Sequence, residues 1–216
     1  MKIIVQKFGG TSVKDDHGRK MALKHIRDAL KEQYKVVVVV SAMGRNGDPY
    51  ATDSFLNLLY GGTASISKRE QDMLLSCGET ISSVVFTSML KSEGISASSL
   101  SGAQAGFLTN EDYTNAKILD MRCERLRREL DHNDVVVVAG FQGATKSGDI
   151  TTIGRGGSDT SAAALGAALE AEFIDIFTDV EGVMTADPRI VENAKPLTTV
   201  TYTEICNLAY QGAKVI

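Results

Sequence analysis

The sequence predicts an α/β fold in which helices cover both faces of a mainly parallel sheet. Short runs rich in β-branched residues alternate along the chain with longer segments of helical periodicity. Two of the short runs, 36–40 and 135–138, consist entirely of valine. Strands that are apolar on both sides fit a parallel sheet buried between two layers. Strand–helix–strand connections in such a sheet are right-handed and place helices on its faces.

The first elements follow from these two periodicities. Ile3–Phe8 is a short apolar run typical of a strand, and the valines of 36–40 predict the next strand. Between them, residues 16–34 are predicted to be helical because apolar side chains recur at helical spacing, at Met21, Leu23, Ile26, Ala29 and Leu30. Residues 44–52 contain two glycines and a proline and are predicted to form a loop.

The later elements continue the alternation. A long helix is expected over 68–93, broken at Gly78 and ended by Gly94. Residues 117–131 are predicted to be a charged amphipathic helix, with apolar positions at Ile118, Leu119, Leu126 and Leu130. Gly140–Gly154 has turn-forming residues between short alternating pieces and predicts a hairpin. The remaining expected elements are strands at Val135–Val138 and Phe173–Phe177 and an alanine-rich helix at Ser161–Ala171.

Composition narrows the function classes. The 216 residues are 43% apolar and 23% charged, which excludes a disordered, collagen-like or disulfide-stapled chain. The net charge of −4 gives no basic field for nucleic acid or an anionic membrane, and no apolar run is long enough to span a bilayer. Three scattered cysteines without a C-x-x-C pair indicate a reducing, cytoplasmic setting and no metal site. The absence of repeats and linkers favours one domain.

The loop after the first strand is the first candidate site. In an open α/β sheet, ligands bind beyond the carboxyl ends of the strands. Lys7 and the pair Gly9-Gly10 stand there, and a lysine beside free backbone N–H groups suits a phosphate. A tight turn followed by a helix cap explains the same residues equally well. Neither a Walker A motif nor a G-x-G-x-x-G dinucleotide motif is present.

The segment Thr151–Thr160 is the richest in candidate ligand-binding residues. Ser158 or Asp159 is expected to cap the following helix, and Arg155 offers a fork for a carboxylate or phosphate. A capped turn alone needs neither this arginine nor the extra glycines, so ligand binding is favoured.

Two other places carry polar groups whose role stays open. Thr178 and Asp179 follow the strand at 173–177, and with Arg189 they form either a nucleotide contact or an ordinary solvated loop. Glu79 stands in an apolar stretch, so its carboxylate is either buried with a partner or faces a site.

Together these segments resemble the catalytic domain of aspartokinases, within the amino-acid kinase family. The matching stretches occur in family order and are KFGGTSV at 7–13, SAMG at 41–44, GETIS at 78–82, AGFQG at 139–143, TIGRGGSDT at 152–160, TDVEGVMTADPR at 178–189 and GAKV at 212–215. The loop at 41–53 is most similar to Bacillus-type isozymes.

The resemblance implies a three-layer α/β/α sandwich with a mostly parallel sheet of about eight strands. It implies that residues 1–216 cover the catalytic domain almost to its C-terminal end, and that the ACT-type regulatory domains are absent from this chain. The implied reaction transfers the γ-phosphoryl group of ATP, with Mg²⁺, to the side-chain carboxylate of L-aspartate. That reaction opens lysine, threonine, methionine and diaminopimelate biosynthesis in the cytoplasm, in an enzyme that is homo-oligomeric at full length.

The resemblance also implies roles for individual residues. Lys7 and Asp159 would be catalytic, the latter by organising the cations. The ATP phosphates would be held by Lys7, Gly9 and Gly10. The residues implied for aspartate are Thr52, Glu79, Arg155 and Ser158, and those implied for the nucleotide are Thr178, Asp179, Met184, Arg189, Lys214 and Val215. Met184 departs from the family, which commonly has tyrosine there.

The implied chemistry agrees with the residue types. A carboxylate nucleophile is ionised at neutral pH and needs no general base, so a histidine or cysteine catalyst is not expected. Alignment and charge neutralisation are needed instead. Two alternatives remain open: an enzyme of the same family that acts on another acid or on UMP, and a non-catalytic nucleotide-binding fragment. A coupled ADP-release assay with each acceptor distinguishes the first alternative from an aspartokinase. ATP binding without turnover would identify the second alternative.

Overall fold

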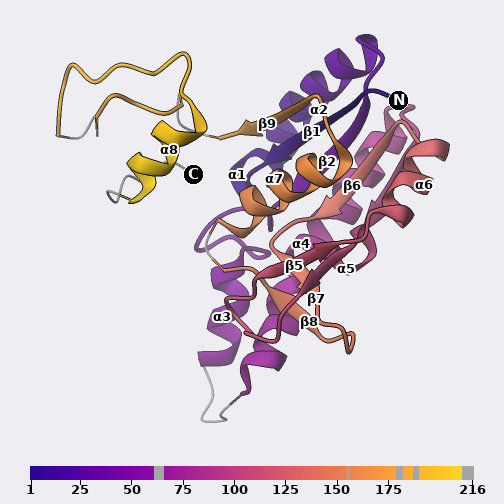
Figure 1. Ribbon diagram of the computed structural model, residues 1–216. Helices are drawn as coiled ribbons and strands as arrows, with labels where there is room; N and C mark the ends of the chain where they lie inside the picture. Colours follow the sequence, from indigo (N-terminus) through magenta and orange to yellow (C-terminus); the bar gives the residue numbers. More distant parts are fainter. Residues whose placement is uncertain (61–65, 155, 179–181, 187–189, 211–216) are drawn as a thin grey trace. The chain divides into compact units, whose positions relative to one another are not determined.

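The computed structural model describes residues 1–60, 66–154, 156–178, 182–186 and 190–210, in two compact units, Met1–Phe177 and Thr178–Ile216. The first unit is built on a five-stranded parallel sheet with the order β3-β6-β2-β1-β9 (Figure 1). Its strands are β1 (Ile3–Phe8), β2 (Lys35–Val40), β3 (Ala97–Leu100), β6 (Val135–Ala139) and β9 (Phe173–Phe177).

The valine run of β2 lies at the centre of this sheet, between β1 and β6. Val36–Val40 of β2 pairs on one side with Ile4–Phe8 and on the other with Val135–Ala139. Every residue of β1 and β6 is buried. Because side chains alternate along a strand, even residues of β1 and β2 enter one apolar cluster and odd residues enter another.

Helices cover both faces of the sheet, as predicted (Figure 1). On one face, α2 (Asp16–Lys31) and α4 (Lys68–Ser92) bury side chains such as Ile26 and Phe86. On the other face, α6 (Glu124–His132) and α7 (Gly157–Leu169) bury Leu126 and Leu165. The first unit is therefore a three-layer α/β/α arrangement.

A second sheet has the order β5-β4-β7-β8 and mixes parallel and antiparallel pairs. Its strands are β4 (Phe107–Thr109), β5 (Ile118–Met121), β7 (Gln142–Ala144) and β8 (Ile150–Thr152), and the β7–β8 pair confirms the predicted hairpin. The expectation of about eight strands in one central sheet is not confirmed, because the described strands divide into five and four.

Three local predictions were wrong. Residues 117–131 are not one helix: β5 occupies Ile118–Met121 because it pairs with β4, and α6 starts only at Glu124. Gly78 does not break α4, which runs through it. Neither Ser158 nor Asp159 caps α7, because the cap is Gly156 in a left-handed conformation with φ of 71°.

Several short elements had no clear signal in the sequence. These are α1 (Gly10–Val13), α3 (Thr52–Tyr60) and α5 (Gly102–Ala105), together with β3 and β4. In the second unit, Met184 forms an isolated antiparallel bridge with Pro196, and α8 spans Tyr202–Tyr210. Thr201 and Glu204 exchange side-chain and backbone hydrogen bonds at the start of α8, as in a capping box.

The helix α4 is long and apolar enough to cross a membrane by length and composition alone. Half of its most apolar window is buried in the protein, however. Its buried residues include Asp72, Ser76 and Glu79, which face the protein interior. We therefore describe α4 as the core helix of this fold.

Candidate active site

The carboxyl ends of β1, β2 and β6 bring the glycine-rich segments to one edge of the central sheet. Parallel strands end on the same side, so loops far apart in sequence meet there. The first turn of α7 arrives at the same edge: Ser158 Oγ lies 3.1 Å from where a Cβ on Gly140 would stand, directly after β6. Four of the sequence-predicted segments therefore converge.

An ion pair joins two of the predicted site residues. Lys7 Nζ lies 2.8 Å from Asp159 Oδ1, and these side chains are only 10% and 19% exposed. Lys7 continues the odd-numbered face of β1, which packs against α7, and Asp159 lies in the first turn of that helix. The contact joins a strand of the central sheet to the first turn of α7 through two opposite charges that are largely shielded from water.

Gly9 lies beside the ammonium group of this pair, and Gly10 packs against the loop after β2. A Cβ on Gly9 would lie 3.6 Å from Lys7 Nζ, so the ammonium group extends over the glycine backbone. A Cβ on Gly10 would lie 2.5 Å from Gly44 O and 2.6 Å from Ala42 O. Only glycine fits such a contact between backbones. The Gly10 carbonyl also accepts a hydrogen bond from Gly44 N at 2.9 Å, which ties together the loops after β1 and β2.

Glu79 of α4 is buried, with 2% of its surface exposed. Its Oε1 accepts a hydrogen bond from Ala42 N at 3.0 Å, just after β2, while Oε2 has no partner in the described part of the chain. Burial raises the pKa of Glu79 to about 8, and the backbone hydrogen bond from Ala42 opposes this only in part. The side chain therefore has one oxygen held by the fold and one available to a ligand.

The turn after β6 is held in a strained conformation. Phe141 has φ of 66°, which is unusual for an aromatic residue. Its N–H donates to Ser161 Oγ at 3.0 Å, and its carbonyl accepts from Ile153 N at 2.8 Å. Gly157 packs against its ring, where a Cβ would lie 2.7 Å from Cδ2. These contacts fix the start of α7 and the buried Ser158 relative to the sheet edge.

Thr52 is the first residue of α3, which packs against α4. The contact is made at Gly78, where a Cβ would lie 3.2 Å from the ring of Phe55 and 2.8 Å from Ala42 Cβ. Gly78 therefore serves close packing beside Glu79, which explains a glycine inside a continuous helix.

The other predicted site residues fall in two groups. Arg155, Asp179, Arg189, Lys214 and Val215 lie outside the described residues. Thr178 and Met184 belong to the second unit, where Thr178 follows directly after β9 and Met184 forms the bridge to Pro196. Asp72, a fully buried carboxylate on α4, had no signal in the sequence beyond its place two helical turns before Glu79.

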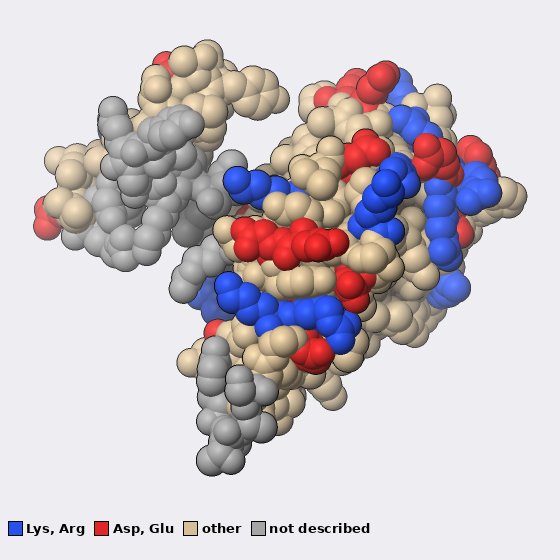
Figure 2. Space-filling model, turned by 60° about the horizontal axis from the view of Figure 1, so that its bottom comes forward, with Lys and Arg blue, Asp and Glu red and all other residues tan. Residues whose placement is uncertain are grey.

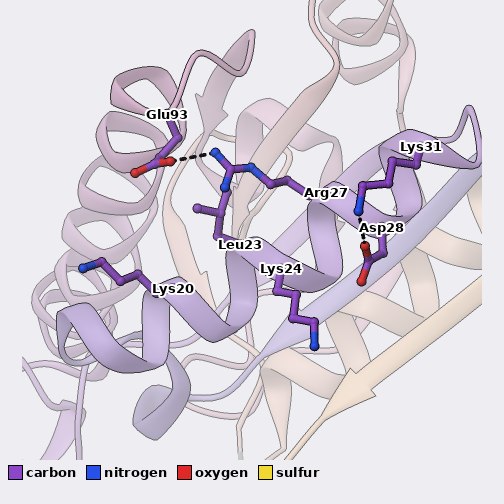
Figure 3. A pocket seen from close by; sticks show the side chains of 7 residues that line it. All are labelled: Lys20, Leu23, Lys24, Arg27, Asp28, Lys31 and Glu93. Carbon is purple, nitrogen blue, oxygen red and sulfur yellow. Dashed lines mark hydrogen bonds and ion pairs between the residues drawn. The ribbon is translucent and has the colours of Figure 1, made fainter.

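Two surface hollows lie away from these residues. One runs along α2 and is lined by Lys20, Lys24, Arg27 and Lys31, of which the last two are paired with Glu93 and Asp28 (Figure 3). Another is lined by residues of α5, β4 and α6. On the face in Figure 2, basic and acidic side chains alternate in bands without a region of one sign. Neither hollow contains any of the predicted site residues.

Known proteins of similar sequence share one name. The chain is 78% identical to Aspartokinase 1 of Bacillus subtilis (strain 168) over all of its 216 residues, which are 54% of that protein. It is 46% identical to Aspartokinase of Mycolicibacterium smegmatis, of which it covers 50%. The chain thus spans about half the length of the curated relatives it matches.

Solved structures are similar over the same region. The structure of E. coli aspartokinase III in complex with aspartate and ADP (R-state) superimposes with a TM-score of 0.82 at 27% identity, covering 100% of this chain and 57% of that one. Aspartate kinase from Synechocystis also gives a TM-score of 0.82, at 43% identity over 99% of this chain and 35% of that one. The model of the Amino acid kinase family matches residues 2–216. On this evidence of sequence, fold and sheet-edge geometry, the chain belongs to the amino acid kinase family.

Proposed function

We propose that this chain provides the catalytic domain of an aspartokinase, which transfers the γ-phosphoryl group of ATP to the side-chain carboxylate of L-aspartate. The observation that carries the proposal is the Lys7–Asp159 ion pair beside Gly9 at the sheet edge. Phosphoryl transfer depends on positioning and on neutralising charge, and a largely buried lysine beside backbone N–H groups supplies both. The similarity to aspartokinases selects aspartate as the acceptor.

On the phosphate side, Lys7 would contact the transferred group while Gly9 and Gly10 allow the nucleotide phosphates to approach the backbone. Asp159 would hold a cation shared with those phosphates, because it is a partly buried carboxylate in the first turn of α7 beside Lys7. Mg²⁺ is typically held by one or two carboxylates together with substrate phosphates, and it would neutralise their charge when bound.

On the acceptor side, the free Oε2 of Glu79 would receive the ammonium group of aspartate. Ser158, Thr52 and Arg155 are proposed to contact its carboxylates, with arginine suited to bidentate recognition. For the nucleotide base and sugar we propose Thr178, Asp179, Met184, Arg189, Lys214 and Val215. The attacking carboxylate is already ionised, so the site needs no general base.

A coupled ADP-release assay on the 216-residue chain tests the proposal. We expect ADP release with ATP, Mg²⁺ and L-aspartate, and much less with glutamate, acetylglutamate, carbamate or UMP. ATP binding by calorimetry without turnover on any acceptor would favour a non-catalytic nucleotide-binding role instead.

A further inference from the structure

Asp72 is a buried carboxylate that the proposed mechanism does not use. It lies on α4 with 0% of its surface exposed. No salt bridge to it occurs among the described residues; instead it accepts three hydrogen bonds. Oδ2 accepts from Thr114 N and from Thr152 N, each at 2.9 Å, and Oδ1 accepts from Thr152 Oγ1 at 2.7 Å. A buried charge is unfavourable unless its oxygens are satisfied, so this site is built around the carboxylate.

One hydrogen-bond partner of Asp72, Thr152, begins the segment that leads into the candidate active site. Thr152 ends β8, and the chain continues through Gly154 to the first turn of α7 with Ser158 and Asp159. The segment around Thr114 packs on this stretch: Ala116 N donates to Thr152 O at 2.9 Å. A Cβ on Gly154 would lie 2.8 Å from Asn115 Oδ1. One carboxylate therefore holds two touching segments against α4.

Asp72 is the first of three polar contacts on one face of α4. Asp72, Ser76 and Glu79 stand at positions i, i+4 and i+7, which lie above one another on a helix. Ser76 O accepts a hydrogen bond from Gln142 Nε2 at 2.8 Å, and Glu79 Oε1 accepts from Ala42 N. Each contact holds a different segment that ends at the site: the start of the Thr152–Asp159 stretch, the turn after β6 and the loop after β2.

We infer that Asp72 is a positioning residue, which sets the place of Thr152–Gly154 relative to Glu79, and with it the start of α7, where Gly157 N donates to Gly154 O at 3.0 Å. The inference rests on the proposed function, in which aspartate binds between Glu79 and Ser158. On the nucleotide side, Gly9 and Gly10 belong to the loop after β1, and Asp159 is held separately by its ion pair with Lys7 of β1 at 2.8 Å. Loss of Asp72 should therefore weaken the use of aspartate far more than the use of ATP.

Two substitutions of Asp72 differ in how many of its hydrogen bonds they keep. In Asp72→Asn, the amide oxygen can accept both backbone N–H groups while its NH₂ donates to the Thr152 hydroxyl, which is also an acceptor. Asp72→Ala leaves the buried N–H of Thr152 and the partly buried N–H of Thr114 without this acceptor. We expect Asp72→Ala to raise the KM for aspartate by about tenfold to hundredfold, as small misplacements do, with the KM for ATP changed by less than about threefold. Asp72→Asn should restore most of the loss.

Leu90→Ala is the matched control, because Leu90 is a fully buried residue of the same helix that lies outside the three contacts. Leu90→Ala should lower the free energy of unfolding in urea, but it should not raise the KM for aspartate more than the KM for ATP. Equal rises in both KM values for Asp72→Ala, or the same pattern in Leu90→Ala, would overturn the inference. If Asp72→Ala does not fold, Thr152→Val removes only the hydroxyl bond and should show the same separation at smaller size.

Amide hydrogen exchange gives a readout that does not depend on activity. Asp72→Ala should accelerate exchange at Thr114 and Thr152 selectively, whereas uniform acceleration across α4 would overturn the positioning role. A wild-type chain without aspartate-dependent ADP release would refute the proposed function, and the exchange result would still decide whether Asp72 holds these segments.

Discussion

Replacing Glu79 by glutamine should stabilise the fold while removing the proposed ammonium contact. Burial raises the pKa of Glu79 to about 8 from 4.5. Between these two values the native state holds a proton that the unfolded chain has released. The contribution of Glu79 to the free energy of unfolding is therefore fully present below pH 4.5. It decreases as the pH rises toward 8, by about 1.4 kcal/mol per pH unit. At pH 7 the loss is about 3 kcal/mol.

Glutamine avoids this loss because it does not titrate, and its amide oxygen can keep the hydrogen bond from Ala42 N. Urea unfolding followed by circular dichroism, from pH 4.5 to 8.5, measures the effect. The free energy of unfolding of Glu79→Gln should exceed that of the wild type by a difference that grows with pH and levels off above about pH 8. Glu111→Gln, at an exposed loop position, is the charge-matched control and should run parallel to the wild type.

Parallel pH profiles for the wild type and Glu79→Gln would refute this reasoning, since they would mean that Glu79 is ionised in the native protein at neutral pH. The same protonation predicts a signature of substrate binding. If an ammonium group meets the Glu79 carboxylate, the proton must leave, so aspartate binding at pH 7 should release close to one proton. Calorimetry in buffers of different ionisation enthalpy measures this release, which Glu79→Gln should abolish.

Three further outcomes are expected. Lys7→Ala should lower kcat by about 10²–10³ in steady-state assays, as loss of one preorganised donor does, and an unchanged kcat with a raised KM for ATP would assign Lys7 to ground-state binding. Arg155→Ala should raise the KM for aspartate far more than that for ATP; the reverse would place Arg155 at the phosphates. Gly10→Ala should destabilise the fold by about 1–3 kcal/mol in urea, because its Cβ would meet the Ala42 and Gly44 carbonyls; unchanged stability would contradict this close approach.

Much of the fold was predictable because its signals are local. The valine runs at 36–40 and 135–138 could only be buried strands, and the structure pairs them side by side in the central sheet. Since ligands bind beyond the carboxyl ends of parallel strands, the sequence also indicated that Lys7 and Gly10 stand at the edge of the sheet where the loops meet. Residue type also indicated that Glu79 needs a partner or a ligand.

Other features depended on segments that meet only in three dimensions. Residues 118–121 have helical periodicity, yet they form β5 because β4 offers backbone pairing there. Gly78 reads as a helix breaker, but the approach of Phe55 and Ala42 makes it a packing position. The Lys7–Asp159 ion pair and the three hydrogen bonds of Asp72 join residues that are far apart in sequence. Periodicity reports which face of an element is apolar, whereas the partner of a buried charge is set by tertiary packing, so only the structure decided these contacts.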